Sequence, residues 1–384
     1  MIRSFKVRLF PNQKQEELFW KHINGSRFVW NYGLEHHIKR YHNGETRISG
    51  FNLRKVFTKL KKQDEYSWLN ELSGHTIAII CIDLDKAYKR FFNKVSNKPK
   101  FKKKSKTKKS FPVRQDVFYF KDNCATIEKI GKVKCQTDYD FPQGRMACKF
   151  SNPRIQYLDN KWILTIGMEC ENQVQKLNDY SMGIDLGINK LAVVRYSENN
   201  LVFKNINKAP RVKKLSAKLK HLQRNCARKY NTNNKSCRYE ERYFKSNGIL
   251  KTEEKIRKIH NTLSNIRENH LHQVTHKLVE LLPHRVVMED LNVQGMIKNK
   301  HLSRVIIEQR FSEFIRQMEY KCEDRGIEFI QADRWFPSSK KCSQCGYKKS
   351  NLKLKDRVYR CEKCGLIIDR DENAAINLMN YSDV

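Results

Sequence analysis

The sequence predicts an α+β protein of several domains, and three observations lead to this prediction. Short segments that alternate apolar and polar residues open the chain and return between residues 111 and 170, whereas the stretch between them has apolar residues at helical spacing. From residue 180 onward, apolar strands alternate with long amphipathic helices, and four cysteines form two closely spaced pairs. At 384 residues, the chain is long enough for roughly two to four domains.

The first hundred residues predict one strand followed by a helical bundle. Met1–Phe10 (MIRSFKVRLF) alternates apolar and polar residues and stops at a proline, as a strand does. Four helices follow in the prediction, with a turn near Asn24–Gly25 between the first two and a fourth helix from about His75 to Val95. Asp83 and Asp85 lie on that fourth helix at a spacing that points them to different faces. We expect both to be solvated and give neither a catalytic role.

A basic segment and a second group of strands complete the N-terminal half. Lys98–Lys109 (KPKFKKKSKTKK) holds eight lysines in twelve residues, which fits either a disordered, self-repelling linker or a contact with phosphates. The interleaved Phe101 and the basic character of the whole chain favour phosphates. The strands predicted after it are Val117–Phe120, Ala125–Ile130, Lys132–Gln136 and Trp162–Cys170. With the first ten residues they predict a small β-barrel into which the helical bundle is inserted.

The charge of the chain indicates a polyanionic partner. There are 77 Lys and Arg residues against 41 Asp and Glu, a formal net charge of +36, so nucleic acid is the leading candidate. A membrane surface is the rival, but the longest apolar run, Ile77–Ile82, is far too short to span a bilayer, and no basic amphipathic anchor is present. The N-terminus lacks the apolar stretch of a signal peptide, so we expect a cytoplasmic protein whose scattered cysteines stay reduced.

The C-terminal half predicts one mixed sheet with helices. Tyr180–Tyr196 reads as two strands joined by a turn at Gly187–Asn189, and Leu201–Phe203 adds a third. Two long helices with near-heptad seams follow, and we expect these seams to pack on each other. The later elements expected are a strand at His284–Asp290, a helix at Ser303–Asp324, a strand at Gly326–Ala332 and a helix at Asn373–Asn380. This order is that of an RNase H-like sheet.

Three acidic positions in this half point to a divalent-metal site. Asp185 is a lone acid in an apolar strand, where an ionised carboxylate is costly to bury unless it faces a cleft, a partner or a metal. Glu289 ends a later strand, and either Asp369 or Asp371 stands at the start of the last helix. Carboxylates suit Mg²⁺, and two such ions about 3.5–4 Å apart could activate a water for phosphodiester hydrolysis.

The acids adjacent to these positions, Asp290 and Glu372, are expected to be exposed or to support the others. No GxxxxGK[ST] sequence is present, so hydrolysis of a nucleoside triphosphate is not indicated.

Four cysteines predict a structural zinc site. Cys342, Cys345, Cys361 and Cys364 form the pattern CxxC–x15–CxxC. Two such knuckles supply four thiolates to a tetrahedral Zn²⁺, and the glycine after each pair eases the turn of the backbone around sulfur. The alternatives are a disulfide or a redox CxxC. A closed four-cysteine site leaves no position for water, so this ion is not the catalytic one.

Several motifs resemble those of the TnpB family, RNA-guided nucleases encoded in insertion sequences and related to type V CRISPR effectors. The resembling segments are GIDLGINKLAV, VVMEDLNVQGM, RWFPSSKKCSQCG and CEKCGLIIDRDENAAINL, with RLFPNQKQEELFW, LDKAYKRFF and KPKFKKK in the N-terminal half. The resemblance implies a RuvC nuclease domain with Asp185, Glu289 and Asp371 as ligands of two Mg²⁺ ions, and Asp369 as a neighbour. Implied domains are a wedge barrel (1–10 and 112–178), a recognition domain with a basic linker (11–111) and the nuclease domain (179–384), which carries a helical insert (205–283) and a zinc ribbon (335–368).

The resemblance also implies partners. These are a structured guide RNA from the transposon end and double-stranded target DNA beside a short transposon-adjacent motif, read near Ser73–Ile77; a monomer is favoured. The residues predicted to contact nucleic acid are Lys98, Lys100, Lys102, Lys103, Lys104, Lys213, Lys214 and Arg224. Alternatives are an RNA-guided repressor without nuclease activity, which the presence of all three acids opposes, and a guide-independent junction resolvase, which would not need the bundle or so much charge. A transposase proper is disfavoured because no HUH pair with a tyrosine stands out, and a zinc-ribbon accessory factor would explain only about thirty residues.

Overall fold

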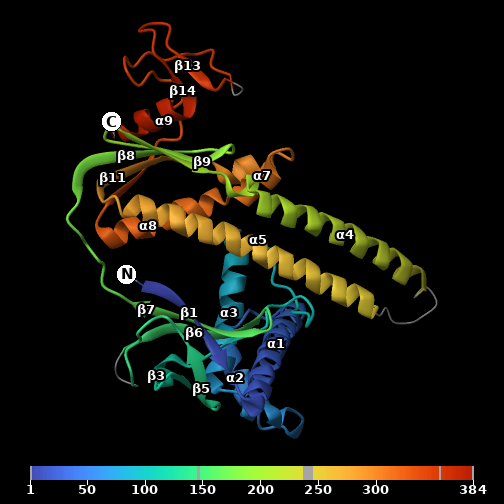
Figure 1. The fold of residues 1–384 in the computed structure, drawn as a ribbon. Coiled ribbons are helices and arrows are strands. Elements are labelled where there is room, and N and C mark those ends of the chain that lie inside the picture. The colour runs from blue at the N-terminus through green and yellow to red at the C-terminus, as the bar shows by residue number, and fades with distance from the viewer. Residues whose placement is uncertain (1, 145–147, 237–244, 354–355, 383–384) are drawn as a thin grey trace. The chain divides into compact units, whose positions relative to one another are not determined.

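The computed structural model describes residues 2–144, 148–236, 245–353 and 356–382, and it divides into two compact units, Met1–Glu171 and Asn172–Val384 (Figure 1). Each unit has hydrophobic clusters of its own. The finer domain boundaries expected from the sequence stay predictions, and the two units are described separately below.

The sheet of the first unit is built around its N-terminal strand. Its strands are β1 (Ile2–Phe10), β2 (Ser110–Pro112), β3 (Tyr119–Lys121), β4 (Cys124–Ile127), β5 (Gly131–Gln136), β6 (Phe150–Leu158) and β7 (Lys161–Glu169). They are ordered β2-β6-β7-β1-β5-β4-β3, and β1 buries Phe5, Val7 and Leu9 on one face. The sheet ends at β2 and β3 within the described residues, so the expected barrel is a half-barrel.

Two strands of this sheet, β2 and β6, were not predicted from the sequence. β6 contains Pro153, and its register against β7 shifts between Ser151 and Arg154. Proline lacks a backbone N–H and interrupts a ladder, so it normally argues against a strand. Here the irregularity accommodates it, and the strand continues on both sides.

The helical bundle follows β1 and packs around a separate core. Its helices are α1 (Gln13–His42), α2 (Gly50–Leu60) and α3 (Gly74–Phe92), with a 3-10 helix at Asp64–Glu71; another 3-10 helix, Gln115–Val117, lies between β2 and β3 of the sheet. The predicted turn near Asn24–Gly25 is wrong, because α1 is one continuous helix. A Cβ atom on Gly25 would lie 2.3 Å from Leu72 Cδ1. The glycine therefore allows close side-chain packing and does not mark a turn.

The expectation that Asp83 and Asp85 are solvated is also wrong. Asp85 is only 9% exposed and forms ion pairs with Arg47 and with Lys89, whose Nζ lies 3.4 Å from Asp85 Oδ2. Asp83 is half-buried, and its carboxylate accepts a hydrogen bond from Arg154. Both acids therefore hold cationic side chains in place.

The sheet of the second unit has the order expected from the sequence. Its strands are β8 (Asn178–Leu186), β9 (Lys190–Tyr196), β10 (Asn199–Lys204), β11 (Pro283–Glu289) and β12 (Glu328–Ala332). They are ordered β10-β9-β8-β11-β12; the first three form an antiparallel meander, and β11 runs parallel to both β8 and β12. Helices cover both faces, with α9 on one side and α5 and α8 on the other (Figure 1).

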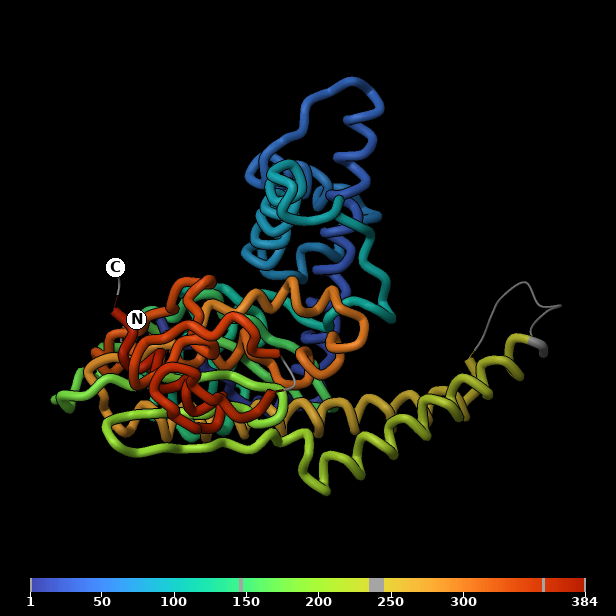
Figure 2. Tube along the Cα trace, turned by 90° about the horizontal axis from the view of Figure 1, so that it is seen from above, coloured from blue at the N-terminus to red at the C-terminus, as the bar shows by residue number. Residues whose placement is uncertain are grey.

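The helices of this unit include a long antiparallel pair. They are α4 (Pro210–Ser236), α5 (Asn247–Val279), α6 (Val293–Lys298), α7 (Ser303–Gln309), α8 (Phe311–Arg325) and α9 (Arg370–Met379), with a 3-10 helix at Ile206–Lys208. α4 and α5 run side by side (Figure 2) and bury Val212, Ile259 and Leu263 in the seam between them. The predicted packing of the two seams is confirmed.

The single helix predicted at Ser303–Asp324 is broken into α7 and α8. Arg310 has a left-handed φ of 57° at the break, its guanidinium donates a hydrogen bond to Ser264 Oγ, and it pairs with Glu268 at 3.7 Å. Both partners are on α5. No glycine or proline marks the break, so a tertiary contact decides it.

The remaining strands, β13 (Val358–Arg360) and β14 (Ile367–Asp369), form a small hairpin. The second cysteine pair lies in the connection between them, and β14 leads directly into α9. Over the ranges that the structure describes, we find no helix with the length and apolar character needed to cross a membrane.

Candidate functional site

Two of the predicted acids stand side by side at the ends of parallel strands. Met288 of β11 pairs with Ile184 of β8, so Glu289 and Asp185 occupy the next position on each strand. Ile184 and Met288 point into the core beneath the sheet. Since side chains alternate along a strand, Asp185 and Glu289 point to the opposite face, which α9 covers.

A glycine places the third acid near the other two. A Cβ atom on Gly183 would lie 2.1 Å from the backbone oxygen of Ala375 and 2.3 Å from the backbone nitrogen of Met379. Only a residue without a side chain lets α9 approach β8 this closely. Asp371 lies in the first turn of α9, and its charge acts directly on Asp185.

The three carboxylates form an acidic cluster in which Asp185 is buried and Glu289 and Asp371 are partly buried. Asp185 is 9% exposed, and burial together with the nearby charges of Glu289 and Asp371 raises its pKa well above the ordinary value. Burial also raises the pKa of Glu289. Such a cluster favours binding of a cation, and hard oxygen donors are the ligands Mg²⁺ prefers.

Asp369 differs from Asp371 in its contacts. Its side chain caps α9, where Oδ1 accepts the backbone N–H of Asp371 at 2.9 Å and of Glu372 at 3.2 Å. Oδ2 accepts a hydrogen bond from Lys190 Nζ at 3.1 Å. Burial acts to raise the pKa of Asp369, but the Lys190 ammonium and the backbone donors outweigh burial and lower it. Both oxygens of Asp369 are therefore occupied, whereas Lys190 reaches Asp371 only at 4.0 Å.

The other adjacent acids are held in ion pairs. Glu372 Oε1 lies 3.4 Å from Arg195, and Asp290 accepts a hydrogen bond from Arg334. Both carboxylates are partly accessible. They agree with the expectation of supporting or exposed acids.

Three residues near the acidic cluster escaped the sequence reasoning. Ser338 is buried, and its hydroxyl donates a hydrogen bond to Glu289 Oε1. Asn377 donates to the carbonyl oxygens of Ser338 at 2.7 Å and Lys341 at 2.6 Å. Asn373 donates to the same Lys341 oxygen at 2.7 Å. The available signal was the spacing of Asn373 and Asn377, two polar residues one helical turn apart on an otherwise apolar face.

The four cysteines have the geometry of a zinc site. Cys342 Sγ lies 3.6 Å from Cys364 Sγ, and Cys345 Sγ lies 3.5 Å from Cys361 Sγ. A disulfide would need about 2.05 Å, whereas a tetrahedron with Zn–S distances near 2.3 Å has edges of about 3.8 Å. Burial acts to raise the pKa of Cys361, but the backbone N–H groups of Cys364 and Lys363 lower it to about 6. The residues therefore fit Zn²⁺ and do not fit a disulfide.

The lysine-rich segment lies against helix α1. Trp30 Nε1 donates to the carbonyl of Lys100 at 3.1 Å, and Asn31 exchanges two hydrogen bonds with the backbone of Lys102, at 2.7 and 3.1 Å. Lys102 Nζ lies 3.7 Å from the centre of the Trp30 ring. These contacts fix the segment, which contradicts the alternative of a disordered linker.

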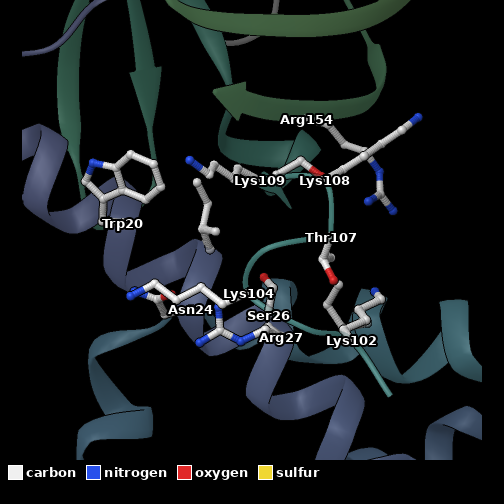
Figure 3. Close-up of a pocket in the computed structure, with 13 residues that line it drawn as sticks. Trp20, Asn24, Ser26, Arg27, Lys102, Lys104, Thr107, Lys108, Lys109 and Arg154 are labelled. Atoms are coloured by element: carbon white, nitrogen blue, oxygen red, sulfur yellow. The ribbon is translucent and has the colours of Figure 1, made fainter. Parts of the chain in front are cut away.

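A basic pocket of about 660 Å³ opens between this segment and α1 (Figure 3). None of the described residues that line it is acidic. Figure 3 shows Lys108, Lys109 and Arg154 across the space from Asn24, Ser26 and Arg27. Ser26 Oγ is buried there without a hydrogen-bond partner. The cationic lining residues are Arg27, Lys102, Lys104, Lys108, Lys109 and Arg154. A pocket with this lining suits a phosphate.

The other predicted contacts lie outside this pocket. Lys100 and Lys103 are exposed on the same segment, and Lys98 lines a second pocket. Lys213, Lys214 and Arg224 belong to the second unit, where they are exposed along α4.

Comparisons with known proteins identify the families and relatives that this chain resembles. Residues 165–300 match the family OrfB_IS605, described as "Probable transposase", residues 1–46 match its helix-turn-helix domain, and residues 311–378 match the Cas12f1-like TNB domain. A protein of Streptomyces pristinaespiralis, provisionally named RNA-guided DNA endonuclease, is 27% identical over 378 residues, which covers 98% of this chain and 88% of its own. InsQ of Escherichia coli K12 carries the same provisional name and is 27% identical over 395 residues, 98% of this chain and 92% of its own. TnpB-like protein L770 of Acanthamoeba polyphaga mimivirus is 22% identical over 413 residues, which covers 98% of this chain and 73% of its own.

The chain belongs to the TnpB family. The TNB match of this TnpB chain begins at α8 and includes the four cysteines and Asp371. The helix-turn-helix match covers β1 and α1, where the structure has a single helix without a turn.

Proposed function

We propose that this TnpB chain is an RNA-guided endonuclease that hydrolyses phosphodiester bonds of target DNA next to a short transposon-adjacent motif. The observation that carries the proposal is the meeting of Asp185, Glu289 and Asp371 in one partly buried acidic cluster, although they come from distant parts of the chain. The names of the relatives and the net charge of +36 support nucleic acid as the substrate. In this proposal, residues 179–384 form a RuvC-like nuclease domain.

In the proposed mechanism, Asp185, Glu289 and Asp371 hold two Mg²⁺ ions. Those ions, when bound, would activate the attacking water and stabilise the leaving 3′-oxygen. The water oxygen bonds to phosphorus as the bond to the 3′-oxygen breaks, and a proton ends on that oxygen, leaving a 5′-phosphate and a 3′-hydroxyl. Ser338 fixes one oxygen of Glu289 by its hydrogen bond, which directs the other oxygen away from the hydroxyl. Lys190 keeps Asp369 out of the ligand set.

The proposed partners are a guide RNA derived from the transposon end and double-stranded target DNA. The basic pocket beside α1 and the exposed cations of α4 would contact phosphates without reading sequence. Base pairing with the guide would then read the target, while the protein reads the adjacent motif. Within Ser73–Ile77, only Gly74 and His75 reach the surface, so His75 is the side chain we assign to motif reading. The wedge barrel (1–10 and 112–178) and recognition domain (11–111) would form this reading half.

A plasmid-cleavage assay with three preparations tests the proposal. RNA-free protein should not cut, protein with its cognate RNA should cut beside the motif, and protein with an altered RNA should cut the newly matching sequence. About a dozen nucleotides at the 3′ end of the guide are exchanged, and the adjacent motif is kept. Mismatches next to the motif should abolish cutting, because pairing starts there. Equal cutting by all three preparations would refute RNA guidance and favour a guide-independent resolvase.

A further inference from the structure

We propose that a second pocket, in the helical bundle, binds one unpaired nucleotide of a single-stranded nucleic acid. The pocket has a volume of about 360 Å³, within the range of small-molecule sites, and lies between the C-terminal part of α1 and the end of α3. The residues that carry the argument are His37, Tyr41, Arg47, Tyr88, Phe92 and Lys98. They are separate from the acidic cluster, the cysteines and the basic pocket.

A buried histidine without partners lines the pocket. His37 is 5% exposed, and neither Nδ1 nor Nε2 has a hydrogen-bond partner. Burial and the nearby Arg47 lower the pKa of His37 to about 4, so the ring is neutral at physiological pH. A neutral imidazole has one N–H donor and one acceptor nitrogen, and buried groups of this kind are nearly always paired. His37 thus offers hydrogen bonds to a ligand that both donates and accepts.

Aromatic side chains form the walls and the rim of the pocket. Tyr88 packs edge-on against His37, with ring centres 5.2 Å apart, and Phe92 stacks on Tyr88 at 6.2 Å. Tyr41 is 77% exposed and Phe92 is 61% exposed, although both are large and partly apolar. Unpaired bases stack on exposed aromatic rings of this kind, whichever base they carry.

The pocket is lined by two cations, Arg47 and Lys98, and by one acid, Glu45, whose carboxylate is paired with Arg40 at 2.6 Å. Arg47 lies over the Tyr88 ring at 5.7 Å, and Lys98 is exposed beside it. The ion pair with Asp85 holds Arg47, so Lys98 is the cation we assign to the ligand. An aromatic cage for a quaternary ammonium would show no such cations. The pocket therefore suits a ligand with a planar ring that forms hydrogen bonds and with a negatively charged group, and a nucleotide has both.

This assignment rests on the proposed function for the presence of nucleic acid, but its test is independent of cleavage. Full-length protein is mixed with short single-stranded RNA or DNA that carries one 5-iodouracil, irradiated, digested and analysed by mass spectrometry. We expect covalent adducts on peptides that contain Tyr41 or Phe92. Adducts with RNA alone identify the guide as the source of the nucleotide, adducts with DNA alone identify a DNA strand, and either result supports the site.

Competition and variants make the test specific. Uridine 5′-monophosphate should suppress the pocket adducts, whereas inorganic phosphate at equal concentration should not. Tyr41→Ala should raise the nucleotide concentration needed for half-suppression at least about fivefold, the lower end for stacking of one base. Phe51→Ala, at an aromatic residue of α2 that is 69% exposed, is the matched control and should leave this concentration unchanged. His37→Phe keeps an aromatic ring but removes both nitrogens, and it should also weaken competition.

Two results would overturn the assignment. If adducts form only within residues 98–109, nucleic acid binds but does not enter this pocket, and the proposed function is unaffected. If filter binding finds no nucleic acid on the protein at all, the proposed function fails as well.

Discussion

At the scale of single residues, the contacts of two neighbouring aspartates, Asp369 and Asp371, distinguish roles that the residue pattern alone leaves open. One carboxylate oxygen of Asp369 accepts a hydrogen bond from the backbone of α9 and the other accepts one from Lys190, so neither is free for a metal. The charge of Asp371 raises the pKa of Asp185. The Asp371 carboxylate lies 4.0 Å from both Lys190 and Arg357, farther than Asp369 lies from Lys190. This contrast supports Asp371 as the third ligand.

Substitution of the acids tests this contrast. Asp185→Ala, Glu289→Ala and Asp371→Ala should each abolish magnesium-dependent cleavage, because each removes a proposed ligand, while gel-shift assays should still detect RNA and target DNA. Asp369→Ala should retain measurable cleavage. The ligand assignment is wrong if Asp369 proves essential and Asp371 dispensable.

The pKa of Lys102 predicts a pH dependence of nucleic-acid binding. Burial lowers this pKa to about 8, while Asp83 of α3 opposes the shift and Arg154 of β6 adds to it. Above pH 8 the folded protein loses this charge, so affinity for a single-stranded oligonucleotide should fall between pH 7.5 and pH 9. The unfolded chain keeps the proton up to about pH 10.4, so stability should instead rise with pH over that window.

Lys102→Arg is the control, since arginine stays charged throughout. Fluorescence anisotropy at constant ionic strength measures the affinity. Identical pH profiles for Lys102→Arg and the unmodified protein would contradict the assignment.

At the scale of elements, alternation and helical spacing predict most strands and helices, and the misses have local causes. Pro153 conceals β6, whose irregular register tolerates it. Gly25 resembles a turn residue but provides space for Leu72, and Arg310 breaks a helix through contacts with α5. Asp185 and Glu289 could be found because they interrupt apolar strands. Ser338 could not, because its partner is 49 residues away.

The approach of α9 to β8 predicts that Gly183→Ala damages the site. The added Cβ would clash with backbone atoms of α9, which cannot move independently of the helix. We expect loss of cleavage and a lower Tm. Gly25→Ala meets only the flexible end of Leu72 and should have a smaller effect, and Gly74→Ala, with no atom within 4 Å, should leave the Tm nearly unchanged or raise it. Circular dichroism of the three variants checks this order, which equal Tm values would contradict.

The sulfur geometry predicts about one zinc ion per chain, because a closed tetrahedral site takes one ion. Elemental analysis of purified protein measures it. Cys342→Ser or Cys361→Ser should lower both the zinc content and the Tm, because metal binding stabilises such ribbons. Cys81→Ser, at a buried cysteine of α3, controls for the loss of any thiol: it should keep the zinc. Protein without zinc, or with a disulfide in reducing buffer, would contradict the prediction.

At the scale of the whole molecule, the charge of +36 is distributed over both units, from the basic pocket to α4. Composition alone predicts a polyanionic partner. It cannot predict where phosphates bind, because that depends on which lysines the fold brings together. Arg154 joins Lys104 and Lys108 from a strand about fifty residues away in the sequence, for example.

The salt dependence of RNA affinity measures how many phosphates are neutralised by cationic side chains of the protein. Log affinity for single-stranded RNA should fall linearly with log salt, with a slope of about −0.7 for each phosphate neutralised. Lys104→Gln should reduce the steepness by about 0.7. Lys39→Gln should not change it, since Lys39 is already paired with Glu35 at 2.8 Å. Titrations between 50 and 300 mM salt, read by filter binding, would contradict the pocket assignment if both variants behave alike.

The asparagines of α9 have a consequence for exchanging parts between relatives. Asn373 and Asn377 hold the carbonyl of Lys341, beside the first cysteine knuckle, and Asn377 also holds Ser338, which in turn binds Glu289. A chimera cut at residues 335 and 368 would join a foreign knuckle to native asparagines, and its Glu289 would lose its support wherever the two backbones differ. A graft extended to residue 380 carries both halves of the contact. We expect the longer graft to cleave DNA and the shorter graft to lose cleavage. That result would mean that the ribbon and α9 have to be exchanged together.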